Sequence, residues 1–229
     1  MKNKNKSIQI SCDGGAATGK STGAKMIAKK YKLKFLSSGL LYRYASFLIL
    51  KYKPKNRVSF IKSQFKNLNY SKLEKINLHS PEISEYSAII AKVKEIRNIL
   101  KIFQANFSKK YANCCIEGRD ISTKILPDSD LKFFFRCNLN VAAIRRYNEL
   151  KKKNSKIKLG DVKKALRIRN NLDTKRKNSP LLRHRDSVEI DTGKLDKRAM
   201  LAKMSKHVEK ILETKYGNWT RIKRHKSPS

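Results

Sequence analysis

The sequence predicts an α/β fold of three layers, in which a central parallel sheet of about five strands lies between helices on both faces. Two observations support this prediction. Short apolar runs recur along the chain, and the stretches between them carry apolar residues at helical spacing. The first run leads directly into a glycine-rich loop and then into an amphipathic helix. With 229 residues, 39% of them hydrophobic, the chain is long enough to bury the core of one such domain.

The first half of the chain is predicted to hold two short strands and several helices. Residues 7–12 predict the first strand and residues 35–37 the second, with a helix between them. The pattern is helical from about residue 39 to residue 110, where apolar residues alternate spacings of four and three. This stripe consists of Ile89, Val93, Ile96, Leu100, Phe103 and Phe107.

The second half is predicted to supply three further strands, over residues 114–116, 131–135 and 187–190. A helix between the last two strands has an inward face marked by Val162, Ala165 and Leu166. The final helix carries an apolar side of its own, which indicates a core face. Its residues are Leu201, Met204, Val208, Ile211 and Leu212.

The charge raises the question of nucleic-acid binding, because 55 Lys+Arg against 18 Asp+Glu give a net charge of +37. The lysines are spread over the whole chain and no aromatic residues are interleaved with them in a stacking pattern. We therefore expect solvated helix faces and at most non-specific binding of nucleic acid. Cys12, Cys114, Cys115 and Cys137 lie in or beside apolar runs without the spacing of a zinc site, which indicates buried thiols.

Neither a membrane span nor a signal peptide is predicted. No apolar stretch approaches the roughly 18 residues that a spanning helix needs. Residues 1–6 have the positive charge of a signal-peptide amino terminus, but Asp13 interrupts the apolar segment that follows. We expect a soluble protein of the cytoplasm.

The glycine-rich loop matches the complete pattern GxxxxGK[ST] from Gly14 to Ser21, between a strand and a helix as this motif requires. Its glycines let backbone N–H groups surround phosphate oxygens at a helix N-terminus. Lys20 is expected to reach the β- and γ-phosphates of ATP, and the Ser21 hydroxyl to ligate Mg²⁺. The motif predicts a fold of the P-loop NTPase type. The expected nucleotide-binding residues are Gly14, Gly15, Ala16, Ala17, Thr18, Gly19, Lys20, Ser21 and Thr22.

Other features narrow the class of P-loop protein. The chain has no N/TKxD motif of a GTPase, and its best hydrophobic run, residues 132–135, ends in Arg136 where a helicase-type ATPase has Asp-Glu. Arg43 and Arg119 instead follow predicted strands, at the edge where an α/β sheet places its ligand site.

A second arrangement of charges is predicted on one helix face. Arg169, Asp173 and Arg176 follow one another at spacings of four and three, so they share one side of a helix. Two interpretations remain open for them. They could form a surface salt-bridge ladder, or two arginines held by one aspartate could clamp a phosphate and a ribose.

Taken together, four motifs resemble those of the bacterial cytidylate kinases, which are nucleoside monophosphate kinases. The resemblance runs from Ile8 to about Leu212. DGGAATGKST resembles the family's DGPxxxGKST, and FLSSGLLYR resembles LDSGxxYR. EGRDISTKILPDSDLKFFF resembles DGRDxGTxVxPDAxxKxFL, and RNNLDTKRKNSPL resembles RDxxDxxRxxxPL.

The resemblance implies transfer of the γ-phosphate from Mg·ATP to CMP or dCMP. We expect the enzyme to be a monomer. The resemblance implies one kinase domain over residues 1–219, with a CMP-binding insert at about 39–110, a mobile lid at about 146–165 and a basic tail over 220–229. It also implies a role for each matching residue. The CMP phosphate would contact Ser38, Arg43 and Arg119, and the cytosine would contact Arg97 and Asp120; the family also reads cytosine with a serine, for which we choose Ser87. The sugar and phosphate would contact Arg169, Asp173 and Arg176, and Arg145 and Arg146 would close over ATP. The catalytic set implied is Lys20, Arg119, Arg145 and Arg169.

The chain departs from the family's motifs at four positions. Gly15 stands where the family has Pro, Ser37 and Asn170 stand where it has Asp, and Glu117 replaces a shorter Asp. The insert is also shorter than usual. The alternative function from another class is a P-loop ATPase associated with RNA or the ribosome through its basic surface.

Overall fold

The computed structural model describes residues 7–152 and 155–217. The basic segments at 1–6 and 220–229, on which two of our predictions fall, lie outside these residues. Within them, no helix combines the length and apolar character that a membrane crossing requires.

Five parallel strands form the central sheet, as predicted, in the order β2-β3-β1-β4-β5. Each strand begins or ends within a few residues of its predicted position. The strands are β1 (Gln9–Gly14), β2 (Lys34–Ser37), β3 (Cys114–Gly118), β4 (Leu131–Arg136) and β5 (Val188–Asp191). Because all neighbours are parallel, the carboxyl ends of β1, β2 and β3 meet at one edge, which holds the loop after β1.

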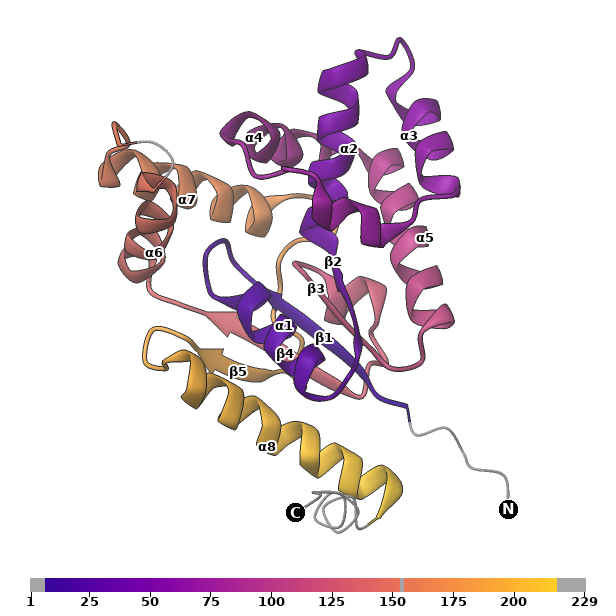
Figure 1. The fold of residues 1–229 in the computed structure, drawn as a ribbon, viewed down its shortest axis with the longest axis vertical. Helices are drawn as coiled ribbons and strands as arrows, with labels where there is room; N and C mark the ends of the chain where they lie inside the picture. The colour runs from indigo at the N-terminus through magenta and orange to yellow at the C-terminus, as the bar shows by residue number, and fades with distance from the viewer. Residues whose placement is uncertain (1–6, 153–154, 218–229) are drawn as a thin grey trace.

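Helices cover both faces of the sheet, and Figure 1 shows α2 to α5 gathered on one side of the molecule with α6 and α7 beside them. The helices are α1 (Lys20–Lys30), α2 (Ser38–Tyr52), α3 (Arg57–Lys66), α4 (Pro81–Ile90), α5 (Lys94–Lys110), α6 (Leu139–Lys151), α7 (Leu159–Lys175) and α8 (Lys197–Tyr216). A short 3₁₀ helix, η1 (Tyr70–Lys75), and a π-helical turn, η2 (Ile121–Ile125), complete the described elements.

The core divides between the two faces because strand side chains alternate. On β3, Cys115 packs with α1 and α8, whereas Cys114 and Ile116 pack with α2, α3 and α5. Phe133 and Phe135 of β4 are fully buried on the α1–α8 side. Helices therefore cover both faces of the sheet. A ligand site can form at the edge where the carboxyl ends of the strands lie.

Two predicted apolar faces differ from the structure. The stripe predicted from Ile89 onward is interrupted, because α4 ends at Ile90 and α5 begins at Lys94; Ile89 is 56% exposed, while Ile96 and Leu100 are buried. On α7, Val162 and Leu166 are buried as predicted, but Ala165 is exposed because it lies about 100° around the helix from Leu166.

Candidate active site

The loop between β1 and α1 has the backbone geometry that its glycines permit. Gly14 has φ +157°, and a Cβ there would lie 2.4 Å from the carbonyl oxygen of Phe135 on the neighbouring strand. Gly19 has φ +76° and caps α1, whose first turn holds no acidic residue. The two glycines therefore let the chain turn tightly from the strand into the helix and present the helix N-terminus at the sheet edge.

Lys20 lies at the start of α1 and is buried in an ion pair with Glu117 at the end of β3. Burial lowers the pKa of Lys20 despite the opposing effect of the Glu117 carboxylate. Burial alone would raise the pKa of Glu117, but the charge of Lys20 and the hydrogen bonds from Lys20 and Ser37 lower it. The surroundings thus favour the charged form of Glu117, whereas burial works against the charged form of Lys20.

Glu117 also gathers hydroxyl groups, because it accepts a hydrogen bond from Ser21 Oγ at 3.1 Å and one from Ser37 Oγ. The parallel register places Glu117 beside Cys12 of β1 and Ser37 of β2, so three strands fix its position. These oxygen atoms are the donors that Mg²⁺ prefers. Sequence reasoning noted Glu117 only as a substitution and missed this role. Its place at the end of a strand that pairs with β1 could have revealed it.

Asp173 on α7 holds three arginines. Its carboxylate lies 2.7 Å from Arg119 Nε, 3.5 Å from Arg169 Nε and 3.5 Å from an Arg176 terminal nitrogen. Burial alone would raise the pKa of Asp173, but Arg119, Arg169 and Arg176 lower it. Asp173 is only 3% exposed, so the predicted i,i+4 and i,i+3 pairs exist but form no surface ladder. The side chains of Asp173 and Arg176 are buried, that of Arg169 is partly exposed, and Arg119 joins them from the end of β3.

Arg43 on α2 lies beside this group, and its Nε is buried without a hydrogen-bond partner. Burial, reinforced by the charge of Arg169, lowers the pKa of Arg43 to about 10. Arg119 and Arg146 lower this pKa further, while Glu117 opposes them. A desolvated guanidinium among like charges is costly unless an anion pairs with it.

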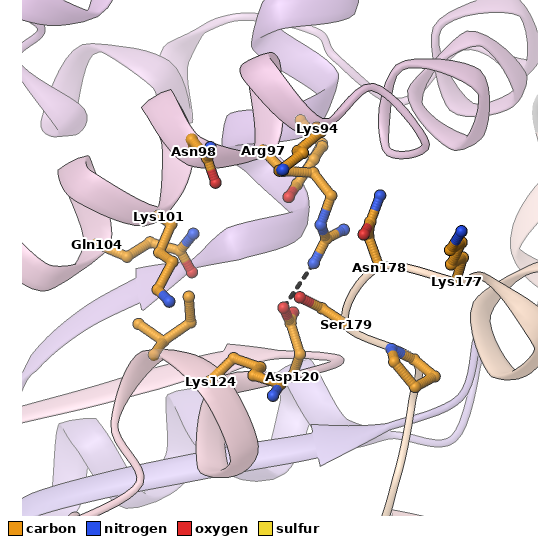
Figure 2. A pocket seen from close by; sticks show the side chains of 13 residues that line it. Lys94, Arg97, Asn98, Lys101, Gln104, Asp120, Lys124, Lys177, Asn178 and Ser179 are labelled. Carbon is orange, nitrogen blue, oxygen red and sulfur yellow. Dashed lines mark hydrogen bonds and ion pairs between the residues drawn. The ribbon is translucent and has the colours of Figure 1, made fainter.

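Arg97 and Asp120 form a second buried ion pair, at 2.5 Å, on the wall of a cavity of about 370 Å³. Figure 2 shows the two side chains facing each other, with Lys94, Asn98 and Lys101 on the side from which Arg97 comes. A terminal nitrogen of Arg176 lies 3.7 Å from the second oxygen of Asp120. Arg176 therefore connects the Arg97–Asp120 pair to the arginines around Asp173.

The two predicted serines lie at the border of this cluster. Ser38 is the first residue of α2 and is buried against Gly118, next to Arg119 in the chain. Ser87 on α4 is buried too, and its Oγ lies 3.4 Å from Arg169, which also donates to the carbonyl of Ser84 at 3.1 Å. The fold thus brings residues from α2, α4, α5, α7 and the end of β3 to one place.

The two arginines predicted to close over ATP lie on α6 and have partners within the protein. Arg145 donates to the carbonyl of Thr192 at 2.7 Å, and Arg146 pairs with Glu149 at 3.0 Å. Thr192, which follows β5, donates from its hydroxyl to the carbonyl of Thr18 in the loop at 2.8 Å. Sequence reasoning missed Thr192, since no motif marks it. The contact of Arg145 with nucleotide stays a prediction.

Comparisons with known proteins show the family to which the chain belongs. The cytidylate kinase family model matches residues 10–210. The curated cytidylate kinase of Clostridium tetani is 31% identical over 93% of this chain and 99% of its own length. That of Bartonella tribocorum is 33% identical over 91% of this chain and 97% of its own length.

Among solved structures, an uncharacterized protein from Eubacterium ventriosum superposes on this chain with a TM-score of 0.53. The match covers 88% of this chain and 98% of the other chain at 15% sequence identity, so it supports the fold alone. The family match begins within β1 and ends within α8, and it includes both the loop and the arginine cluster. The chain therefore belongs to the cytidylate kinase family.

Proposed function

We propose that this protein transfers the γ-phosphoryl group of ATP to CMP or dCMP, giving ADP and CDP or dCDP. The observation that carries the proposal is Arg43, a half-buried arginine whose buried Nε has no hydrogen-bond partner and whose neighbours include other arginines and Glu117, the partner of Lys20. A dianionic phosphate placed there would pair with several cations at once. The family match supports this reaction over the RNA-associated ATPase that the net charge suggested.

The loop is the donor side of the proposed site. Lys20 and the N-terminus of α1 would hold the phosphates of ATP, with Arg145 closing from α6. Ser21, supported by Glu117, would hold Mg²⁺, which supplies charge neutralisation at the transferring phosphoryl group. The hydroxyl and carboxylate oxygens gathered at Glu117 fit this ion.

The arginine cluster is the proposed acceptor side. Ser38, Arg43 and Arg119 would bind the CMP phosphate, which must lie within reach of the γ-phosphate of ATP. Arg169 and Asp173 would contact the sugar. Arg176, which bridges Asp173 and Asp120, would act between the phosphate and the base.

Cytosine would be recognised by Arg97 and Asp120, with Ser87 at its edge. An ionised carboxylate can only accept a hydrogen bond, so Asp120 suits the N4 amino group of cytosine. Arg97 can only donate, so it suits N3 or O2. Uracil would present a carbonyl to Asp120, so two acceptors would face each other inside the protein, which costs on the order of 1–3 kcal/mol.

The proposed reaction needs little from the protein besides positioning and positive charge. An oxygen of the CMP phosphate attacks the γ-phosphorus, the bond to the β–γ bridging oxygen breaks, and ADP leaves. Lys20, Arg119 and Arg169 stabilise the charge that spreads over the transferring group. Closure of the α6–α7 region, at about residues 146–165, would exclude water and so prevent hydrolysis of ATP. We propose that the enzyme acts as a monomer in pyrimidine nucleotide metabolism of the cytoplasm.

A coupled ADP-release assay with CMP, dCMP, UMP, AMP and dTMP tests the proposal. We expect CMP and dCMP to give the highest kcat/KM and ADP release to be slow without an acceptor. Equal rates with and without a monophosphate would contradict a kinase. An ATPase rate that RNA stimulates, through binding that weakens steeply with salt, would favour the RNA-associated alternative.

A further inference from the structure

Asn170 lies on α7 next to Arg169, and its side chain contacts the phosphate-binding loop. Its Oδ1 accepts a hydrogen bond from the backbone N–H of Ala16 at 3.0 Å. Arg169, one residue earlier, instead contacts Ser84 and Ser87 of α4. Two consecutive residues of one helix thus contact opposite sides of the site, since Asn170 contacts the donor side and Arg169 the acceptor side.

Gly15 is what allows Asn170 to come this close. A Cβ at Gly15 would lie 3.1 Å from Asn170 Oδ1, closer than most such contacts, and 3.4 Å from Thr18 Cγ2. Gly15 and Asn170 are also two of the positions at which the chain departs from the family pattern. The structure shows that these two departures touch each other, so they form one local feature.

Apolar packing holds the same part of the loop against the same helices. Ala16 and Ala17 pack on a small cluster formed by Ala142 and Ala143 of α6 with Val162 and Leu166 of α7. This packing is not directional, whereas the hydrogen bond from Ala16 fixes which way the peptide N–H points. Ala17 follows it with φ +57°, in the left-handed region, so the backbone turns directly after the contact.

From these contacts we propose that Asn170 is a positioning residue for the phosphate-binding loop, which fixes the Ala16 peptide so that the following N–H groups are arranged for the phosphates of the donor nucleotide. A neutral amide does this without placing a negative charge beside those phosphates. The inference rests on the proposed function for the identity of the donor, Mg·ATP. It makes no use of the acceptor.

Calorimetric titration of the full-length protein with Mg·ATP, and separately with CMP, tests the inference. We expect Asn170→Ala to raise the Kd for Mg·ATP roughly fivefold, as for one lost hydrogen bond, and to change the Kd for CMP less than twofold. Asn171→Ala is the matched control, since it removes an exposed amide one residue further along α7 and should leave both constants unchanged. The melting temperatures of all variants show whether a loss of binding reflects unfolding.

A double-mutant cycle with Gly15→Ala separates positioning from a general defect of the loop. The added Cβ should push Asn170 away from Ala16, so the single variant should also weaken Mg·ATP binding. The double variant Gly15→Ala/Asn170→Ala should then be no weaker than the worse single variant. Strictly additive effects would overturn the inference.

Three further outcomes would also overturn the inference: an unchanged Kd for Mg·ATP in Asn170→Ala, equal losses for ATP and CMP, or tighter Mg·ATP binding, which would mean that Asn170 competes with phosphate for the N–H of Ala16. These outcomes differ from failure of the proposed function. A wild-type protein that binds Mg·ATP but transfers nothing to CMP would refute the reaction and leave the role of Asn170 intact.

Discussion

The donor side and the acceptor side of the site manage their charges in different ways. On the donor side, Lys20 is buried against Glu117, and each charge has its partner within the protein. On the acceptor side, the carboxylates of Asp120 and Asp173 form ion pairs with four arginines, namely Arg97, Arg119, Arg169 and Arg176, and the described part of the chain shows no ion pair for Arg43. The donor side is therefore balanced as it stands, whereas the acceptor side carries an excess of positive charge.

This difference indicates where an anion contributes most. Burial is the main cause of the lowered pKa of Arg43 and of Arg169, and the charges of neighbouring arginines add to it, so an incoming phosphate would offset both costs. At the donor side, an ATP phosphate must instead share Lys20 with Glu117. Removing a cation should consequently have opposite effects on stability at the two sides, and this contrast can be tested.

The largest effect is expected for Lys20→Met. Phosphoryl transfer should slow by about 10³-fold, as for loss of a group that stabilises the transition state. The melting temperature should fall as well, because Glu117 is left buried without its cation. Steady-state kinetics and thermal melts measure both. In Lys20→Met/Glu117→Gln, we expect stability to return while activity does not; a double variant that recovers activity would contradict the role of Lys20.

Arg43→Met should give the opposite change in stability. The KM for CMP should rise roughly 10- to 100-fold, as for loss of a charge-assisted hydrogen bond. The melting temperature should rise, because a half-buried cation whose buried Nε has no hydrogen-bond partner is replaced by an apolar side chain of similar length. A lower melting temperature would show that Arg43 is already stabilised within the protein, and the contrast between the two sides would fail.

A third test divides the acceptor side into phosphate and base contacts. Asp120→Asn should lower the preference for CMP over UMP roughly tenfold, since the amide can also donate to the uracil carbonyl. Arg119→Ala should weaken CMP, dCMP and UMP about equally, because a phosphate carries no information about the base. The readout is kcat/KM for each acceptor. An unchanged CMP:UMP ratio in Asp120→Asn would mean that cytosine is recognised elsewhere.

The smallest effect concerns pH. The pKa of Asp173 is lowered in the folded protein, so its ion pairs stabilise the fold fully above the unfolded value of about 3.9. That contribution is lost as the pH falls below this value toward the folded pKa. Urea unfolding at pH 7 and pH 3 should therefore show a smaller loss of unfolding free energy in Asp173→Asn than in the wild type. An equal loss would mean that the arginines do not hold the Asp173 carboxylate.

Sequence patterns predicted most of the elements correctly, because the alternation of strands and helices and the spacing of apolar residues are local properties. The five strands, the helical segment from about 39 to 110 and the buried face of α8 are confirmed. Ile89 shows the limit of such patterns. Its spacing continues the stripe of α5, but a turn after Ile90 redirects the chain, and periodicity alone does not locate that turn.

The candidate site shows the same division between local and distant information. The loop from Gly14 to Thr22 is one contiguous motif, and the resemblance to a family marked the arginines one by one. Neither the motif nor the resemblance revealed which charged side chains form ion pairs. Asp173 and Arg119 are 54 residues apart in the sequence, and Glu117 and Lys20 are 97 residues apart. Asn170 and Thr192 reach the loop over greater distances still.

The sequence by itself determined the α/β class, the glycine-rich loop between the first strand and the first helix, and the family, because each depends on local spacing or on a contiguous motif. Only the tertiary structure decided the charge balance of the site, namely a paired lysine on one side and arginines in excess on the other. The physical reason is that parallel strand order and helix packing bring residues from distant segments to one edge of the sheet. Pairing energies depend on those distances and on burial, which no spacing along the chain records.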